Sequence, residues 1–287
     1  MTWIAVEPVL KAKPISGFLF PYAEKLEADL ARAFRDHVKS LAEIDWQALE
    51  AAIGKKDIDA AVKCFPWRDW NKSLGKKFHD LFTQGLLVGG EATLSEGTIG
   101  LPHMVVSERA AAWATDYAAK LVVEIGDETK TALRRLVTSE IRMGIHPFDQ
   151  IKDIRQMVGL TERQALAGIN FRMALEKKDY APDRVDKLLA RYVEGQHKWR
   201  AENIARTESM QALNRGQNEA WRQSADAGYL DEAKTEREWL AAGTRVCPRC
   251  LDMDGQRAPL RGTYPDDSDG PPKHPSCRCG QTLKFLT

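Results

Sequence analysis

The sequence has almost no excess of charge of either sign. Among its 287 residues, 42 are Lys or Arg and 41 are Asp or Glu, which gives a formal net charge of +1. A protein that grips nucleic acid over its whole surface needs clustered positive charge, so this balance argues against that class. A basic face of limited extent stays compatible with it.

Long apolar runs are absent as well. No run reaches the roughly 18 apolar residues that a membrane-spanning helix needs, so we expect no membrane contact. The N-terminus lacks a basic start, and Glu7 and Pro8 interrupt its apolar residues, which argues against a cleaved secretory signal. Apolar residues make up 43% of the chain, enough to bury a core and too many for general disorder.

The signatures of common catalytic sites are missing too. The sequence contains no His-Glu-x-x-His, no glycine-rich phosphate loop and no Gly-x-Ser-x-Gly. It also lacks the His-x-Glu that precedes the cysteines of zinc deaminases. The turn at Asp254-Gly255 would break the helix that a thioredoxin-like Cys-x-x-Cys requires. We therefore expect no enzymatic activity.

Helical spacing of apolar residues dominates what is present. It predicts a body of several helices along most of the chain, up to about residue 225. The expected helices cover residues 21–52, 57–62, 76–88, 107–125, 127–143, 149–158, 161–177 and 182–225.

Several residue types place the expected helix ends. Thr161 and Gln164 fit a capping box, whereas the glycine pair 89–90 and Gly126 are expected to interrupt helices. Gly216 lies inside the last helix, where the missing side chain predicts close approach of another backbone.

The composition changes after residue 228. Two strands are expected, over 236–240 and 279–285, and the prolines and glycines between them exclude long helices. We therefore predict a mainly α fold, with a multi-helix body followed by a small α+β C-terminal knuckle rich in turns.

Cysteine is scarce and unevenly distributed. Cys64 stands alone, whereas the other four cysteines lie close to the C-terminal end: Cys247, Cys250, Cys277 and Cys279. Because the chain has no export signal, we interpret the clustered cysteines as a metal site rather than as disulfides.

The clustered cysteines form two short hooks. The first is Cys247-Pro248-Arg249-Cys250, and the second, about twenty residues later, contains His274, Cys277 and Cys279. Such paired hooks can build a tetrahedral zinc site, and zinc prefers thiolate and imidazole ligands. We predict one zinc ion per chain.

Five candidate ligands compete for four positions. We expect Cys247 and Cys250 to bind together with two of His274, Cys277 and Cys279, and the two cysteines of the second hook are the first choice. Two alternatives stay open. The thiols are free in a turn-rich segment with His274 only hydrogen-bonded, or the cysteines pair as disulfides.

A charged string lies on the last helix of the body. Arg206 and Glu208 flank Thr207, and because residues two apart on a helix do not face each other, each charge is expected to have a partner elsewhere, on the knuckle. An ion pair on a packing face and a functional surface are both compatible with the string.

These motifs together resemble a known family. The string 206–208, Asn214, Trp239, the first hook with Asp252 and Gly255, and the segment 271–279 are similar, in this order, to phage Mu protein F-like proteins. These are minor head, or head morphogenesis, proteins of tailed bacteriophages. The motif-bearing part covers about residues 200 to 285, and the helices before it resemble the family's N-terminal body.

The resemblance implies a structural component of the phage head, located in the virion and in the host cytoplasm during assembly. It implies association with the portal protein, with the major capsid or scaffold protein as further partners, and nonspecifically with packaged DNA. The alternative is a zinc-dependent nucleic-acid-binding module or nuclease. The lack of a general-base histidine or paired carboxylates near the hooks argues against a nuclease.

The length and the resemblance suggest more than one domain. We divide the chain into an N-terminal helical region at 1–92, a central helical body at 103–200 and a head-morphogenesis module at 201–287. The last segment contains the Cys/His cluster and the motif residues: Arg206, Thr207, Glu208, Asn214 and Trp239.

Overall fold

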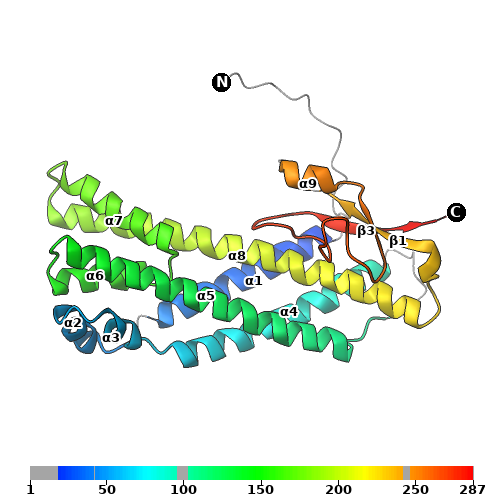
Figure 1. Cartoon of the computed structure of the whole chain (residues 1–287), viewed down its shortest axis with the longest axis horizontal. Helices are drawn as coiled ribbons and strands as arrows, with labels where there is room; N and C mark the ends of the chain where they lie inside the picture. The colour runs from blue at the N-terminus through cyan, green and yellow to red at the C-terminus, as the bar shows by residue number, and fades with distance from the viewer. Residues whose placement is uncertain (1–18, 42, 96–102, 242–245, 287) are drawn as a thin grey trace, which may run out of the picture. The chain divides into compact units, whose positions relative to one another are not determined.

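A computed structural model describes residues 19–41, 43–95, 103–241 and 246–286 of the chain. Long helices dominate it, as predicted (Figure 1). The helices are α1 (Leu19–Ser40), α2 (Trp46–Gly54), α3 (Ile58–Lys63), α4 (Trp67–Ser95), α5 (Glu108–Arg142), α6 (Pro147–Met157), α7 (Glu162–Glu176), α8 (Pro182–Asp226), the 3₁₀ turn η1 (Glu232–Lys234) and α9 (Pro248–Met253). The strands are β1 (Thr235–Leu240), β2 (Arg257–Pro259) and β3 (Gly280–Phe285).

The described residues belong to two compact units. The first takes its residues from Met1–Glu27, Phe82–Ala111 and Ile204–Thr287, and it contains the strands and α9. The second comprises Ala28–Leu81 and Ala112–Asn203. The division of the chain into three consecutive segments stays a prediction.

The capping box predicted at Thr161 and Gln164 is confirmed, and a second side-chain cap occurs at Ser107. The amide of Gln164 donates to the Thr161 hydroxyl at 3.3 Å, and the amide of Thr161 donates back to the Gln164 side chain at 3.1 Å. Ser107 caps α5 by accepting from the amide of Ala110 at 3.2 Å. These bonds satisfy backbone donors that have no partner within the helix.

The single helix expected over 21–52 is wrong. The structure has two helices there, because α1 ends at Ser40 and α2 begins after Asp45. The Asp45 carboxylate accepts from two backbone amides of α2, each at 3.0 Å, which makes it a strong N-cap. A capping aspartate inside a continuous apolar pattern therefore starts a new helix.

The interruptions expected at two glycine positions are also wrong. Helix α4 continues through Gly89 and Gly90 to Ser95, and α5 continues through Gly126. A Cβ atom on Gly89 would lie 2.3 Å from the carbonyl oxygen of Leu213 in α8. The glycine pair is therefore a point of close helix packing, which outweighs the weak helix propensity of glycine.

The close approach predicted for Gly216 is confirmed. A Cβ atom on this residue would lie 2.2 Å from the carbonyl oxygen of Leu86, so α8 and α4 pack backbone against backbone in the first unit. This contact fixes the part of α8 that lies beside the strands.

The strands form one antiparallel sheet in the order β2-β1-β3, and both strands predicted from the sequence are confirmed. In the central strand β1, alternate residues are buried, namely Thr235, Arg237 and Trp239. Figure 1 shows the sheet and α9 beside the C-terminal half of α8. One face of β1 therefore points into the interior of the knuckle.

Replacing Gly216 with alanine is expected to destabilise the first unit by about 2 kcal/mol, because the backbone of α4 must move to admit the methyl group. The matched control is Gly195→Ala on the same helix, where a Cβ atom meets nothing within 4 Å. That change should be neutral or stabilise by up to about 1 kcal/mol. Urea unfolding followed by circular dichroism measures both, and equal effects would contradict the packing argument.

Candidate metal centre

The first hook is formed by the start of a short helix. Cys247 is the N-cap of α9, Pro248 occupies the first helical position, and Cys250 lies in the first turn. Proline is favoured at this position because it fixes the backbone angle and has no amide hydrogen to satisfy. The amide of Cys250 donates to the carbonyl oxygen of Cys247 at 3.0 Å, so both thiols lie at the same end of the helix.

The second hook is a turn that leads into β3. The amide of Cys277 donates to the carbonyl oxygen of His274 at 3.1 Å, and Ser276 has a positive φ of 62°. This turn reverses the chain within four residues. It brings the imidazole and the following thiols to the first hook.

The structure brings all five candidate ligands together. The Nε2 atom of His274 lies 3.2 Å from the Sγ atoms of both Cys247 and Cys250. The Sγ atoms of Cys250 and Cys277 are 3.7 Å apart. The ligand atoms form two close trios, Cys247–Cys250–His274 and Cys250–Cys277–Cys279, so Cys250 belongs to both.

These separations fit the edges of a tetrahedral site. Bonds of about 2.3 Å to sulfur and about 2.0 Å to nitrogen give edges of roughly 3.8 Å between sulfurs and 3.5 Å between sulfur and nitrogen. The measured distances of 3.7 and 3.2 Å are close to these values. All five cysteines of the chain are free thiols, which does not support the disulfide alternative.

The thiols of the cluster differ in protonation: burial raises the pKa of Cys250 to about 12 and keeps it a thiol while no ion is bound, whereas Cys277 has a lowered pKa. The thiol of Cys279 donates a hydrogen bond that helps to lower the pKa of Cys277 to about 5, so Cys277 is a thiolate at neutral pH. The Nδ1–H of His274 donates to the carbonyl oxygen of Pro275 at 2.9 Å, which leaves the Nε2 lone pair facing the two sulfurs. Metal-binding histidines commonly have such a partner on their second nitrogen.

Two side chains of α8 hold the second hook. The Thr207 hydroxyl accepts from the amide of Ser276 at 2.8 Å, and the Asn214 amide group donates to the carbonyl oxygen of Cys279 at 3.2 Å. Because these α8 residues are seven positions apart, they lie two turns apart on one face of the helix. Thr207 and Asn214 therefore attach the hook to the helix at both ends of its turn.

The partner expected for Arg206 on the knuckle is wrong. Its guanidinium is 42% exposed and lies 4.0 Å from the carboxylate of Glu27 in α1. The knuckle reaches the same carboxylate through Arg278, whose second nitrogen donates to it at 3.1 Å. Glu208 is buried on α8. The charged groups of Arg206 and Glu27 are 4.0 Å apart and the Arg206 side chain is half-exposed, so this pair contributes little to stability.

One protein-family model matches the part of the chain that contains α8 and the hooks. The family described as Phage Mu protein F like protein covers residues 131–282, which is more than half of the chain. The chain belongs to this family. No curated protein and no solved structure gives a significant match.

The Mu F-like match starts within α5 and ends within β3, so it includes α8 and both hooks. Membership makes the chain a head morphogenesis protein of the phage type, a virion component, and suggests a structural rather than an enzymatic role. Within the described ranges, no helix is both long and apolar enough to cross a membrane.

A pair of carboxyl groups does occur in the Mu F-like chain, but in the second unit. Glu140 and Asp153 are buried side by side, and burial raises the pKa of Glu140 to about 9 and that of Asp153 to about 6. Asp153 also accepts from Arg172 at 2.6 Å. Because both carboxyl groups are closed off from solvent, they are not arranged to act on a substrate.

The sequence analysis missed Arg237, which organises the knuckle. Its guanidinium is fully buried and donates to five acceptors. These are the carbonyl oxygens of Pro259, Gly262 and Asp269 and the side-chain oxygens of Asn218 and Gln281. The signal was present, because the two-residue period of a strand places Arg237 on the same face as Trp239.

Trp239 lies in the interior of the knuckle. It is fully buried and packs edge-on against Tyr264, with the ring centroids 5.3 Å apart. Cys250, Cys277 and Cys279 belong to the same buried cluster. The thiols of the candidate centre are therefore part of the knuckle's small core.

Replacing Arg237 with methionine is expected to lower the free energy of unfolding by at least about 3 kcal/mol, because buried acceptors without a donor each cost roughly 1–3 kcal/mol. The control is Arg257→Met in β2, whose guanidinium is 44% exposed and pairs with Glu238 at 3.3 Å. That change should cost less than about 1 kcal/mol. Thermal unfolding measures both variants, and similar melting temperatures would show that the Arg237 network is dispensable.

Proposed function

We propose that this chain is a structural component of a tailed phage head that acts at the portal vertex during head assembly and DNA packaging or delivery. The family match, which spans α8 and the knuckle, is the observation that carries the proposal. The portal protein is the main partner. The major capsid or scaffold protein and, nonspecifically, packaged DNA are further partners.

In this proposal the knuckle is a zinc-stapled module. Its ligands are Cys247 and Cys250 from the first hook, with His274 and Cys277 from the second. The geometry favours His274 over the first choice from the sequence, Cys279, because the imidazole nitrogen is 3.2 Å from both sulfurs of the first hook. Cys279 instead donates to the thiolate of Cys277.

The role of the ion is to join the first hook, at the start of α9, to the second hook, which leads into β3. A small turn-rich segment buries little apolar area, so a metal adds stability that packing does not supply. The second hook is already attached to α8 through Thr207 and Asn214. The ion therefore connects α9 to α8 by way of the second hook.

We expect one zinc ion per chain in protein purified without chelators or a metal-affinity tag. Elemental analysis gives the ratio, and removal of the ion with a chelator should lower the melting temperature of the knuckle. Cys250→Ser should abolish binding, because Cys250 belongs to both trios. Cys64→Ser, which changes a half-buried thiol in the second unit, is the matched control and should leave the ratio at one.

Two further variants separate the ligand sets. His274→Ala should reduce the zinc content or affinity more than Cys279→Ala does if His274 is the fourth ligand. If Cys279→Ala reduces the zinc content more than His274→Ala does, the second pair of ligands is Cys277 and Cys279. A ratio near zero for the unmodified protein, with the fold intact, would contradict the zinc proposal altogether.

The role at the portal is tested by assembly. We expect the chain to co-purify with the cognate portal protein after co-expression and to be present in purified particles. The double substitution Thr207→Ala with Asn214→Ala should weaken incorporation, because it releases the second hook from α8. Absence from particles would contradict the proposal.

The competing function, a zinc-dependent nuclease or nucleic-acid reader, has a separate test. Incubation with DNA and Mg²⁺, Mn²⁺ or Zn²⁺ should give no cleavage above a heat-treated control. Cleavage that a single point substitution abolishes would establish the competing function. Binding of DNA should be weak and fall steeply with salt, as expected for nonspecific phosphate contacts.

A further inference from the structure

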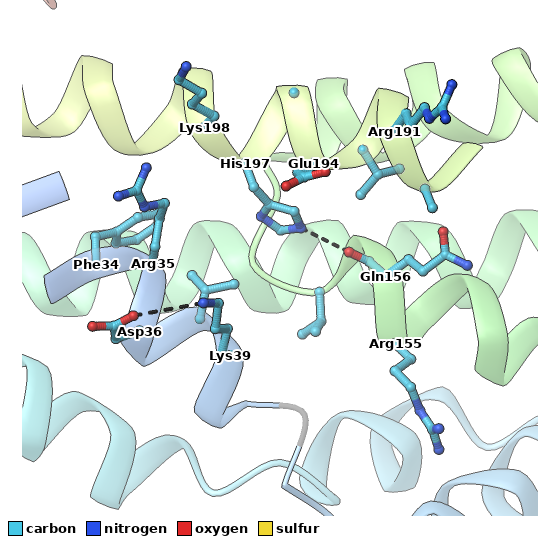
Figure 2. A pocket seen from close by; sticks show the side chains of 15 residues that line it. Phe34, Arg35, Asp36, Lys39, Arg155, Gln156, Arg191, Glu194, His197 and Lys198 are labelled. Carbon is cyan, nitrogen blue, oxygen red and sulfur yellow. Dashed lines mark hydrogen bonds and ion pairs between the residues drawn. The ribbon is translucent and has the colours of Figure 1, made fainter. Parts of the chain in front are cut away.

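A groove in the second unit has no role in the proposed function. Its volume is about 820 Å³, and it is bounded by α1, the C-terminal end of α6 and the part of α8 around His197 (Figure 2). This volume lies in the range of roughly 300–1,000 Å³ that is typical of small-molecule sites. The whole lining belongs to the second unit.

The rim of the groove is basic. Five cationic side chains surround it, against two carboxylates, Asp36 and Glu194. The five are Arg35, Lys39, Arg155, Arg191 and Lys198. This local excess of positive charge contrasts with the near-neutral chain, whose net charge is +1.

Four of the five rim cations have no strong partner, whereas Arg155 stacks on the Trp46 ring, 4.3 Å from its centroid. Among the described residues, Arg35 and Arg191 have no ion-pair partner, and both are exposed. Lys39 and Lys198 have only distant, exposed partners, at 4.0 and 3.9 Å. Such pairs contribute little and are readily exchanged for a stronger anion. In Figure 2 the labelled cations come from α1, α6 and α8, and the Arg155 side chain points away from the groove.

The lining of the groove is polar and apolar in about equal parts. Three buried valines, Val38, Val158 and Val193, contribute to its apolar part, which we call the floor. A site for a bare inorganic anion needs no such floor, because a small ion is held by polar contacts alone. The floor therefore indicates a ligand with an apolar or planar body in addition to its charge.

Two polar atoms in the wall lack hydrogen-bond partners. The Nε2–H of His197 donates to the carbonyl oxygen of Gln156 at 2.8 Å, and burial lowers the pKa of His197 and keeps the ring neutral. The Nδ1 atom is then an acceptor, and it has no partner. The side-chain oxygen of Gln156 is a second buried acceptor without a partner. Buried acceptors of this kind are costly unless a ligand satisfies them.

We propose that this groove binds a nucleotide unit, with its phosphate groups at the basic rim and its base over the valine floor. Both acceptors lie beneath the surface of the groove, so an amino group on the base would donate to Nδ1 of His197 or to the side chain of Gln156 once the Gln156 side chain rotates aside. The inference is independent of the zinc site and of the portal. A base inside a double helix is stacked and paired, so the source is a free nucleotide or an unpaired strand.

The test uses the full chain and fluorescence anisotropy of two probes, labelled dA12 and labelled ATP, with unlabelled ATP, UTP, inorganic phosphate and a duplex of the same length as competitors. We expect ATP and dA12 to bind at the same site and more tightly than inorganic phosphate, UTP or the duplex. Competition by ATP together with binding of dA12 identifies a strand as a source. Binding of ATP alone identifies the free nucleotide. Either result supports the proposal.

Three variants locate the ligand. Arg35→Glu and Arg191→Glu should each weaken binding by about tenfold, because charge-assisted contacts to phosphate are among the stronger polar interactions. Arg163→Glu, an exposed residue of α7 outside the lining, is the matched control for the charge change. Gln156→Leu should remove the preference for ATP over UTP while binding of inorganic phosphate stays the same.

Three results would overturn the proposal. They are no saturable binding of any nucleotide at low salt, equal weakening by Arg163→Glu, and tighter binding of a polyglutamate peptide than of dA12. The last result would assign the groove to an acidic protein segment. Unchanged melting temperatures of the variants show that any loss of binding is not a loss of fold.

Discussion

The attachment of the second hook to α8 positions the rest of the knuckle. Thr207 and Asn214 bind backbone groups of the hook, so these two contacts hold its turn independently of the hook's own side chains. The first hook meets it from α9, and β3 leaves it to pair with β1. A helix side chain that binds backbone constrains a loop more strongly than packing alone, because both distance and direction are set. The helix is in turn held against α4 by the glycine contact at Gly216.

A second constraint is the buried guanidinium of Arg237. It joins β1 to the segments on either side, while Trp239 on the same face of the strand packs among the thiols of the candidate centre. The knuckle is therefore held by the polar network of Arg237 and by the cysteine cluster around Trp239, two residues further along the same strand. Two anchors of different chemistry on one short strand explain how a segment with so many turns keeps a defined structure.

Spacing along the chain predicted the features that depend on near neighbours. The capping box at Thr161, the strand around Trp239 and the two hooks all follow from residues within a few positions of each other. Helix interruptions at Gly89 and Gly126 were predicted wrongly, because their effect depends on a distant contact. The local cost of glycine in a helix is only about 1 kcal/mol. Close packing outweighs it, against the backbone of Leu213 at Gly89 and against the side chain of Asn71 at Gly126. Asp45 was overlooked because the apolar pattern continues across it.

The candidate sites also differ in how far they depend on residues that are close in the sequence. The hooks are visible in the sequence, but the choice between His274 and Cys279 depends on which nitrogen of the imidazole faces the sulfurs, and this follows from a contact with Pro275. The groove of the second unit has no sequence signature, since its rim collects residues from α1, α6 and α8. Arg237 is an intermediate case. The two-residue period of the strand predicts that its side chain points inward, but it does not predict the five acceptors.

The pairing of Glu27 with Arg278 joins residues 251 positions apart, and the first unit gathers three separated stretches of the chain. During synthesis the N-terminus leaves the ribosome first. Glu27 therefore cannot pair with Arg278 until nearly the whole sequence has been made. Contacts between such distant residues also form slowly, because the long loop between them must close first. The second unit has its last residue at Asn203 and can fold while the remainder is still being synthesised. Synthesis therefore imposes an order on the two units, and any surface built from the knuckle becomes available to other subunits only after the chain has passed Arg278.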